Sequence, residues 1–185
     1  RNNYMTAITR IDDEIIEIID VEKVMSEVVG ADETVSSELV EDYSSQNAGE
    51  RPHILVADDS SVARNQVKRT MEQIGIDTTI VRDGKEALDQ LKAWADEGID
   101  VTKHISLLVS DIEMPEMDGY TLTIEIRKDP RLAGIKILLH SSMSGTFNNT
   151  MVEKVGADKF IPKFSPDDLA STVQELLEEW KTEQP

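Results

Sequence analysis

From His53 onward the sequence alternates short apolar runs with longer segments whose apolar residues recur at helical spacing. Short apolar runs are typical of strands buried on both faces, and helical segments between them are typical of crossovers in a parallel sheet. The runs cover residues 54–57, 78–81, 105–110, 136–141 and 159–162. This pattern predicts an α/β domain of three layers, in which helices cover both faces of a five-stranded parallel sheet.

Start and stop signals place the helices between these strands. Ser60 or Ser61 can cap the first helix, and Asp83 with Glu86 resembles a capping box at the start of the second. The helices are expected over residues 60–74, 83–94, 119–128, 146–155 and 165–180. Residues 98–104 are longer than the connection requires, so we expect them to form a loop.

The first 49 residues differ in composition from the rest of the chain. They carry three Lys/Arg and twelve Asp/Glu, so the acidic excess per residue is highest here. Residues 4–11 and 14–19 are typical of two strands, and residues 21–28 follow at helical spacing before Gly30. A hairpin with one helix is too small to fold alone. We therefore divide the chain into a remnant of another domain at 1–30, a linker at 31–50 and the α/β domain at 51–185.

The linker at residues 31–50 is acidic, rich in serine and poor in apolar residues. Such a composition favours a solvated tether, because the segment has little apolar surface to bury. A short helix around residues 33–43 is the alternative that the sequence leaves open.

The overall composition excludes several classes of function. A net charge of −18 disfavours binding to nucleic acid or to anionic membranes. No apolar run approaches the roughly 18 residues of a membrane-spanning helix. The absence of cysteine excludes disulfides and thiolate metal sites, which suits a reducing compartment. Because residue 1 is Arg and no basic-then-apolar leader follows it, we expect a fragment or a processed chain.

Polar side chains with a shared chemistry follow four of the predicted strands. They are Asp58 and Asp59 after the first strand, Asp111 after the third, Ser141 after the fourth and Lys163 after the fifth. Because right-handed crossovers bring the carboxyl ends of parallel strands to one edge, we expect these side chains to meet there. Three carboxylates suit Mg²⁺, and a lysine with a hydroxyl suits an anionic oxygen group. Phosphoryl transfer to a carboxylate requires this combination.

On these residues, the region 51–181 resembles a response-regulator receiver domain, similar to the single-domain chemotaxis regulator. Asp111 lies in the run Ser-Asp-Ile-Glu-Met-Pro-Glu-Met-Asp-Gly, with the Ser-Ser pair 30 residues later and Lys163 52 residues later. The resemblance implies a (βα)5 flavodoxin-like fold with strand order 2-1-3-4-5. It also implies that Asp111 accepts a phosphoryl group from the phosphohistidine of a sensor kinase.

The same resemblance implies a magnesium site. Asp59, Asp111 and the backbone carbonyl of Glu113 would hold Mg²⁺, and Asp58 would act through water. Glu113 and Met143 occupy positions that tune phosphate lifetime in the family, so the sequence predicts no particular lifetime.

Switching residues are implied as well, with departures from the family pattern. Lys163 would contact the phosphoryl oxygens, and Ser141 would hydrogen-bond one of them on activation. Phe160 matches the aromatic switch position, although the family commonly has Tyr there. Phe164 follows the lysine where the family usually has Pro, and Pro162 precedes it, so the bond before Pro162 is open to cis or trans.

Plainer interpretations stand beside these roles. Asp58 with Asp59 can cap a helix, Lys163 alone is most often a surface lysine, and Phe160 is equally well a core residue. His140 has apolar neighbours and no histidine partner, which favours a packed strand residue over a metal ligand. The joint spacing of the set favours the functional interpretation.

The N-terminal segment carries a second resemblance. Residues 6–23 are similar to the last strands and helix of a CheW-like coupling domain. A coupling domain, an acidic linker and a receiver form the arrangement of the CheV family of chemotaxis proteins. The resemblance implies a cytoplasmic adaptor at chemoreceptor arrays on the inner face of the membrane. Its partners would be chemoreceptors and a CheA-like histidine kinase, with no nucleic acid, no membrane insertion and a monomeric or weakly dimeric state.

Two enzymatic or carrier functions compete with this hypothesis. A Mg²⁺-dependent phosphatase with Asp111 as nucleophile needs a second acid two residues further, and Glu113 has that offset. A flavin carrier on the same fold needs a phosphate-binding Ser/Thr/Gly loop after the first strand, which the sequence lacks. We expect a self-phosphorylating signalling domain, not a turnover enzyme.

Overall fold

The computed structural model describes residues 5–11, 14–19, 34–40, 51–142, 146–163 and 165–183. They belong to two compact units, Arg1–Glu33 and Thr34–Pro185. In the first unit, β1 (Met5–Ile11) pairs with antiparallel β2 (Glu14–Ile19), as predicted. Ile15 of β2 is 70% exposed, which agrees with the expectation that a hairpin alone cannot bury its apolar residues. The predicted helix at 21–28 lies outside the described residues.

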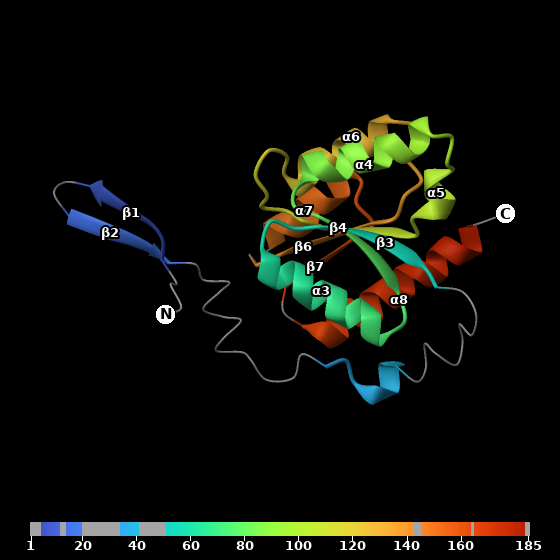
Figure 1. The fold of residues 1–185 in the computed structure, drawn as a ribbon, viewed down its shortest axis with the longest axis horizontal. Helices are drawn as coiled ribbons and strands as arrows, with labels where there is room; N and C mark the ends of the chain where they lie inside the picture. Colours follow the sequence, from blue (N-terminus) through green and yellow to red (C-terminus); the bar gives the residue numbers. More distant parts are fainter. Residues whose placement is uncertain are drawn as a thin grey trace. The chain divides into compact units, whose positions relative to one another are not determined.

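Five strands of the second unit form one parallel sheet (Figure 1). They are β3 (His53–Ala57), β4 (Asp77–Val81), β5 (Leu107–Asp111), β6 (Ile137–Ser141) and β7 (Lys159–Pro162). Their order is β4-β3-β5-β6-β7, which confirms the predicted order 2-1-3-4-5. The three central strands are almost entirely buried because helices cover both of their faces.

Helices occupy both faces of this sheet. They are α3 (Ser61–Gln73), α4 (Gly84–Asp96), α5 (Val101–His104), α6 (Gly119–Lys128), α7 (Thr146–Val155) and α8 (Pro166–Glu183). α3 and α8 cover one face, whereas α4, α6 and α7 cover the other (Figure 1). Among the described residues, no helix is long and apolar enough to cross a membrane.

The two faces of the sheet have separate apolar cores. Ile54 and Val56 of β3 belong to the core beneath α3 and α8, and Leu55 and Ala57 belong to the core beneath the other helices. Successive residues of a strand point to opposite faces, so one strand serves both cores. Burial of each Leu or Ile contributes about 1.5–3 kcal/mol to the free energy of folding. A shift of one residue would exchange the two faces of β3, so this burial fixes its register.

Local capping agrees with the sequence except at one connection. Ser60 Oγ accepts a hydrogen bond from the amide of Ala63, and Asp83 accepts one from the amide of Glu86 at 2.8 Å. The expectation of a loop throughout 98–104 was wrong, because residues 101–104 form the short helix α5. A helix of four residues is too short to show the repeated apolar spacing by which longer helices are recognised.

Residues 34–40, which we call the docked segment, pack against α3 and α8. Val35 is only 6% exposed in the core between these helices, and its amide donates to Gln73 Oε1 at 2.8 Å. This part of the linker is therefore not the solvated tether that its composition favoured. Residues 37–40 are helical, as the alternative interpretation predicted, whereas residues 41–50 lie outside the described residues.

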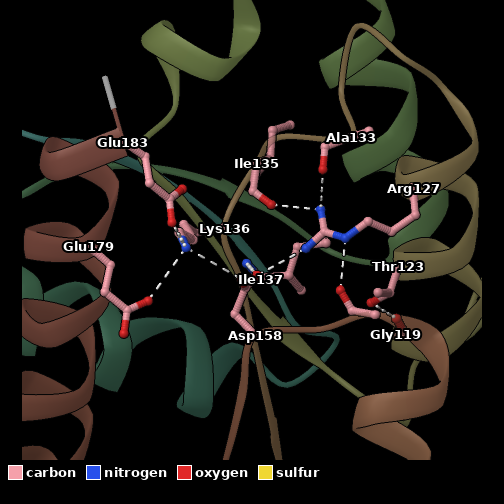
Figure 2. Close-up of polar contacts among 11 residues, drawn as sticks. Gly119, Thr123, Arg127, Ala133, Ile135, Lys136, Ile137, Asp158, Glu179 and Glu183 are labelled. Atoms are coloured by element: carbon pink, nitrogen blue, oxygen red, sulfur yellow. Dashed lines mark hydrogen bonds and ion pairs between the residues drawn. The ribbon is translucent and has the colours of Figure 1, made fainter. Parts of the chain in front are cut away.

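An ionic network ties the helices to the amino ends of β6 and β7 (Figure 2). Asp158, just before β7, accepts hydrogen bonds from Arg127 at 2.9 Å and from the amide of Ile137 at 2.7 Å. Lys136, just before β6, lies 2.8 Å from Glu183 of α8 and 3.7 Å from Asp158. Layers on both faces of the sheet are thus joined at this end by charged contacts.

Candidate functional site

A buried lysine joins two buried carboxylates at the carboxyl edge of the sheet. Asp111 ends β5, while Asp58 follows β3 and Lys163 follows β7. Lys163 Nζ lies 2.8 Å from Asp111 Oδ2 and 3.1 Å from Asp58 Oδ2. None of the three side chains is more than 3% exposed. Three residues separated in sequence therefore meet as the parallel topology predicted.

Backbone contacts hold the acidic loops in place. Asp111 Oδ1 accepts a hydrogen bond from the amide of Ile112 at 2.7 Å, and Asp58 Oδ1 accepts one from the amide of Ser60 at 2.8 Å. Arg64 donates to the carbonyl oxygens of Asp58 and Asp59 at 2.7 and 2.8 Å. The carboxylates are therefore positioned before any ligand is bound.

The loop after β5 returns directly beneath Asp111. The amide of Gly119 donates to the carbonyl of Ile112 at 3.0 Å, and Asp118 caps α6 through the amide of Thr121 at 2.8 Å. A Cβ atom at Gly119 would collide with the backbone carbonyl of Asp111. Glycine is required here because the start of α6 and the end of β5 approach so closely.

Burial and neighbouring charges shift the pKa values of Asp58 and Asp111 in opposite directions. Burial raises the pKa of Asp111 to about 6, with Asp58 adding to the effect and Lys163 opposing it. Burial also acts to raise the pKa of Asp58, but contacts with His140 and Lys163 outweigh it, so the pKa of Asp58 is lowered. Asp58 is therefore a fixed anion, whereas Asp111 titrates close to neutral pH.

Three acids are close enough together to bind one divalent cation. One carboxylate oxygen from each of Asp58, Asp59 and Asp111 lies within 4.8 Å of the others. Oxygen ligands of this kind suit Mg²⁺. Asp58 Oδ2 is buried beside Lys163 Nζ, at 3.1 Å, so Asp58 fits a role toward a metal-bound water better than direct ligation. The side-chain set therefore fits the cofactor that the sequence predicted.

Ser141 and Glu113 interact in a way that the sequence did not indicate. Ser141 Oγ donates to Glu113 Oε2 at 2.8 Å and lies 3.1 Å from Glu113 Oε1. Ser141 is buried at the end of β6, whereas Glu113 is exposed on the loop after Asp111. From the sequence, Glu113 was considered as a backbone ligand of Mg²⁺, as a position that tunes phosphate lifetime and as the second acid of a phosphatase, but not as a partner of Ser141. The spacing of two residues between Asp111 and Glu113 was the available signal that the glutamate side chain reaches the same edge.

His140 contacts the site, although sequence reasoning placed it only in the strand. It is 3% exposed and lies beside Asp111 in the register of β5 and β6. Its Nε2 atom is 3.3 Å from Asp58 Oδ2, without the alignment of a hydrogen bond. The packed interpretation is confirmed, but it is incomplete. His140 lies in register with Asp111 on the neighbouring strand. This position near the carboxyl end of β6 was the feature of the sequence that could have predicted the contact.

The remaining predicted residues occupy β7 and the connection after it. Phe160 is half-buried against the core beneath α4, α6 and α7. The described residues contain no cis peptide bond, so the bond before Pro162 is trans. Phe164 and Met143 lie outside the described residues.

Comparison with known proteins gives a consistent result. A family model described as the response regulator receiver domain matches residues 54–174. Chemotaxis protein CheV3 of Helicobacter pylori is 28% identical across 94% of this chain and 55% of its own length. CheV1 of the same bacterium is 29% identical across 96% of this chain and 54% of its own. The chain thus spans about half the length of these curated relatives, and the match extends beyond the receiver into the N-terminal part.

Proteins that consist largely of a receiver match the second unit. Chemotaxis protein CheY1 of H. pylori is 30% identical across 67% of this chain and 95% of its own length. The receiver domain of Francisella response regulator 1452 is 32% identical, with a TM-score of 0.60 over 70% of this chain and 98% of its own. CheY4 of Vibrio cholerae, at 24% identity and a TM-score of 0.60 over 69% of this chain and 99% of its own, supports the fold alone.

Proposed function

Because this chain belongs to the response-regulator receiver family, we propose that Asp111 accepts a phosphoryl group from the phosphohistidine of a CheA-like chemotaxis kinase. The observation that carries the proposal is the 2.8 Å contact between Lys163 Nζ and Asp111 Oδ2 in a buried site. A buried cation beside a carboxylate neutralises charge that would otherwise build up when a phosphoryl group arrives.

The transfer requires Asp111 as a carboxylate. An Asp111 oxygen forms a bond to phosphorus while the phosphorus–nitrogen bond of the donor breaks, and the electron pair returns to the imidazole. Because the pKa of Asp111 is about 6, most molecules have the ionised nucleophile at pH 7. Lys163 then moves its contact from the carboxylate to the phosphoryl oxygens.

Asp59, Asp111 and the backbone carbonyl of Glu113 would hold Mg²⁺, with Asp58 acting through a bound water. Bound Mg²⁺ would supply positive charge next to the phosphoryl oxygens. The clustering of three carboxylates at this edge supports the assignment.

Ser141 is the proposed switch hydroxyl. It now donates to Glu113, and after phosphorylation it would donate to a phosphoryl oxygen instead. Glu113 is exposed, so water can take the place of Ser141 as its partner. Phe160 would then follow the hydroxyl inward, because it lies on the neighbouring strand β7.

We further propose that the receiver belongs to a CheV-type adaptor at chemoreceptor arrays in the cytoplasm. The hairpin of the first unit and the extent of the match to CheV3 support a coupling domain before the receiver. Phosphorylation of Asp111 would tune signalling between chemoreceptors and their kinase. The receiver would act as a monomer or weak dimer, without turnover of a substrate.

The test is covalent labelling with acetyl phosphate and Mg²⁺. Intact-mass spectrometry should show one added phosphoryl group, and Asp111→Asn should show none. Asp89→Asn is the matched control, because it removes an exposed carboxylate of α4 outside the site and should leave labelling unchanged. Labelling that persists in Asp111→Asn would refute the assignment of the phosphoacceptor.

A phosphatase is the second candidate, because Glu113 has the offset of a general acid and its carboxylate reaches the site. A phosphatase would need the Glu113 carboxyl to protonate the leaving group, whereas in this structure the carboxyl accepts a hydrogen bond from Ser141. A chromogenic phosphate ester distinguishes the two functions. Sustained hydrolysis that depends on Asp111 and Glu113 would favour the phosphatase, whereas a receiver should give no multiple turnover.

A further inference from the structure

The docked segment, residues 34–40, makes specific contacts with both helices on its face of the sheet. Val35 fills the core between α3 and α8, and its amide is held by Gln73 of α3. The amide of Ser36 donates to Asp167 Oδ1 of α8 at 2.8 Å. Gln174, two turns further along α8, donates to the carbonyl of Leu39 at 3.3 Å. The buried Val35 side chain and the three hydrogen bonds together hold the docked segment in one position on α3 and α8.

The bond from Ser36 ends on the connection that also carries the site lysine. Asp167 lies four residues after Lys163, in the first turn of α8. Ser165 starts this helix, since its Oγ accepts from the amide of Asp168 at 3.3 Å and its carbonyl accepts from the amide of Leu169 at 3.0 Å. The start of the helix that holds Ser36 therefore lies two residues beyond the site lysine.

The connection between β7 and α8 has space beside it. A pocket lies between α3, the ends of β6 and β7, and the start of α8. Its walls include Val67, His140, Ile161, Lys163 and Leu169. Val67 and Leu169 also belong to the core that Val35 completes. Because protein interiors are otherwise closely packed, such a space allows the connection to shift without displacing its neighbours.

We propose that the docked segment responds to the state of Asp111. It is held on α8 while Lys163 pairs with the free carboxylate, and it is loosened when Asp111 carries a phosphoryl group. The inference rests on the proposed phosphoacceptor role of Asp111. Release would free the seven residues 34–40 from α3 and α8, so phosphorylation would change the length of chain that is held against the receiver.

Reciprocity gives the proposal a second consequence. If phosphorylation weakens the binding of the docked segment to α8 by some factor, then binding of the segment must weaken phosphorylation by the same factor. A substitution that weakens binding of the segment should therefore favour the phosphorylated state. Asp167→Ala removes the acceptor for Ser36, and Asp168→Ala removes a neighbouring acid from the same helical turn. Both residues are exposed, and both changes remove one negative charge near the helix start, so their comparison isolates the bond to Ser36.

The experiment is hydrogen exchange of the whole chain with and without beryllofluoride and Mg²⁺. We expect exchange across residues 34–40 to accelerate about fivefold on binding, and peptides that contain Ile112 to report binding at the site. Asp167→Ala should exchange rapidly in 34–40 without ligand and bind beryllofluoride about fivefold more tightly. Asp168→Ala should match the unsubstituted chain in both measurements.

The outcomes separate the two levels of the proposal. Binding at the Ile112 peptides with unchanged exchange in 34–40 would overturn the coupling and leave the phosphoacceptor role intact. Equal effects of Asp167→Ala and Asp168→Ala would also overturn it, because helix charge alone would then explain the result. An absence of beryllofluoride binding by the unsubstituted chain would overturn both the coupling and the phosphoacceptor role.

Discussion

The two ends of the parallel sheet each hold a lysine surrounded by acids, but the surroundings differ. Lys136 at the amino end lies 2.8 Å from Glu183 and 3.4 Å from Glu179, and these glutamates are 61% and 45% exposed (Figure 2). Lys163 at the carboxyl end faces Asp58 and Asp111, which are 0% and 3% exposed. Water can therefore solvate the acids at one end and not at the other.

This difference separates a structural network from a reactive site. At the amino end, burial opposes the charge of Lys136, yet the contacts with Glu183 and Asp158 raise the pKa of Lys136. At the carboxyl end, the pKa of Asp111 is raised to about 6, chiefly by burial, in spite of its contact with Lys163. Of the two lysine-centred groups, the one at the carboxyl end holds an acid whose charged form is disfavoured by burial, as is typical of functional sites.

The largest effect should come from exchanging the two lysines for methionine. Lys163→Met removes the cation beside the transferred phosphoryl group, and we expect acetyl phosphate labelling to slow about 10²-fold. Lys136→Met should leave the labelling rate unchanged, because its partners lie at the opposite end of the strands. Labelling kinetics by intact-mass spectrometry check both. Equal rates in the two variants would remove the functional distinction between the ends of the sheet.

The second prediction concerns pH and Asp111. Its pKa in the folded chain, about 6, lies above the ordinary value of 3.8, so the folded state binds the proton more tightly. The contribution of Asp111 to the free energy of unfolding is fully present at low pH, and it is lost as the pH rises from about 4 to about 6. Asp58 has a lowered pKa, so its contribution is lost only at pH below about 4.

Asp111→Asn should therefore be more stable than the unsubstituted chain at pH 7 by about 2–3 kcal/mol without Mg²⁺. The gain should disappear near pH 4, where Asp111 is protonated in both folded and unfolded chains. Saturating Mg²⁺ should reduce this difference in the free energy of unfolding, because it should stabilise the unsubstituted chain, which keeps Asp111, and not Asp111→Asn. Urea unfolding at the two pH values measures the difference. A gain that is independent of pH would contradict the assignment of buried charge to Asp111.

Asp158 tests the opposite end of the sheet. Asp158→Ala removes the acceptor for Arg127 and for the amide of Ile137, and it leaves Lys136 with fewer acids. We expect a loss of about 2 kcal/mol in the free energy of unfolding, less than for a fully buried pair because Asp158 is 25% exposed. Asp96→Ala, which removes an exposed partner of Arg131, is the control and should cost under about 0.5 kcal/mol. Labelling of Asp111 should be unaffected in both variants.

The resemblance to the receiver family implied the sheet order, which the structure confirms. Strand periodicity and right-handed crossovers predicted that Asp111 and Lys163 share one edge of the sheet. The sequence did not predict the contact between Ser141 and Glu113, which depends on the path of one loop and on side-chain rotamers. Val35 escaped prediction for another reason. Val35 and Leu39 have helical spacing, which indicated a short helix but not what it packs against, because that surface between α3 and α8 exists only in the folded receiver.

The smallest effect concerns Glu113, which accepts a hydrogen bond from the proposed switch residue Ser141 at the carboxyl edge of the sheet. Glu113→Gln keeps the size of the side chain but removes its charge, so the bond from Ser141 weakens from a charge-assisted to a neutral one. Because Ser141 must leave Glu113 before it can reach a phosphoryl oxygen, we expect beryllofluoride affinity to rise about threefold, within the range of one hydrogen bond. Glu116→Gln, on the same loop and also exposed, is the matched control. An affinity that falls in Glu113→Gln would mean that the carboxylate assists binding, and that its bond to Ser141 does not restrain the switch.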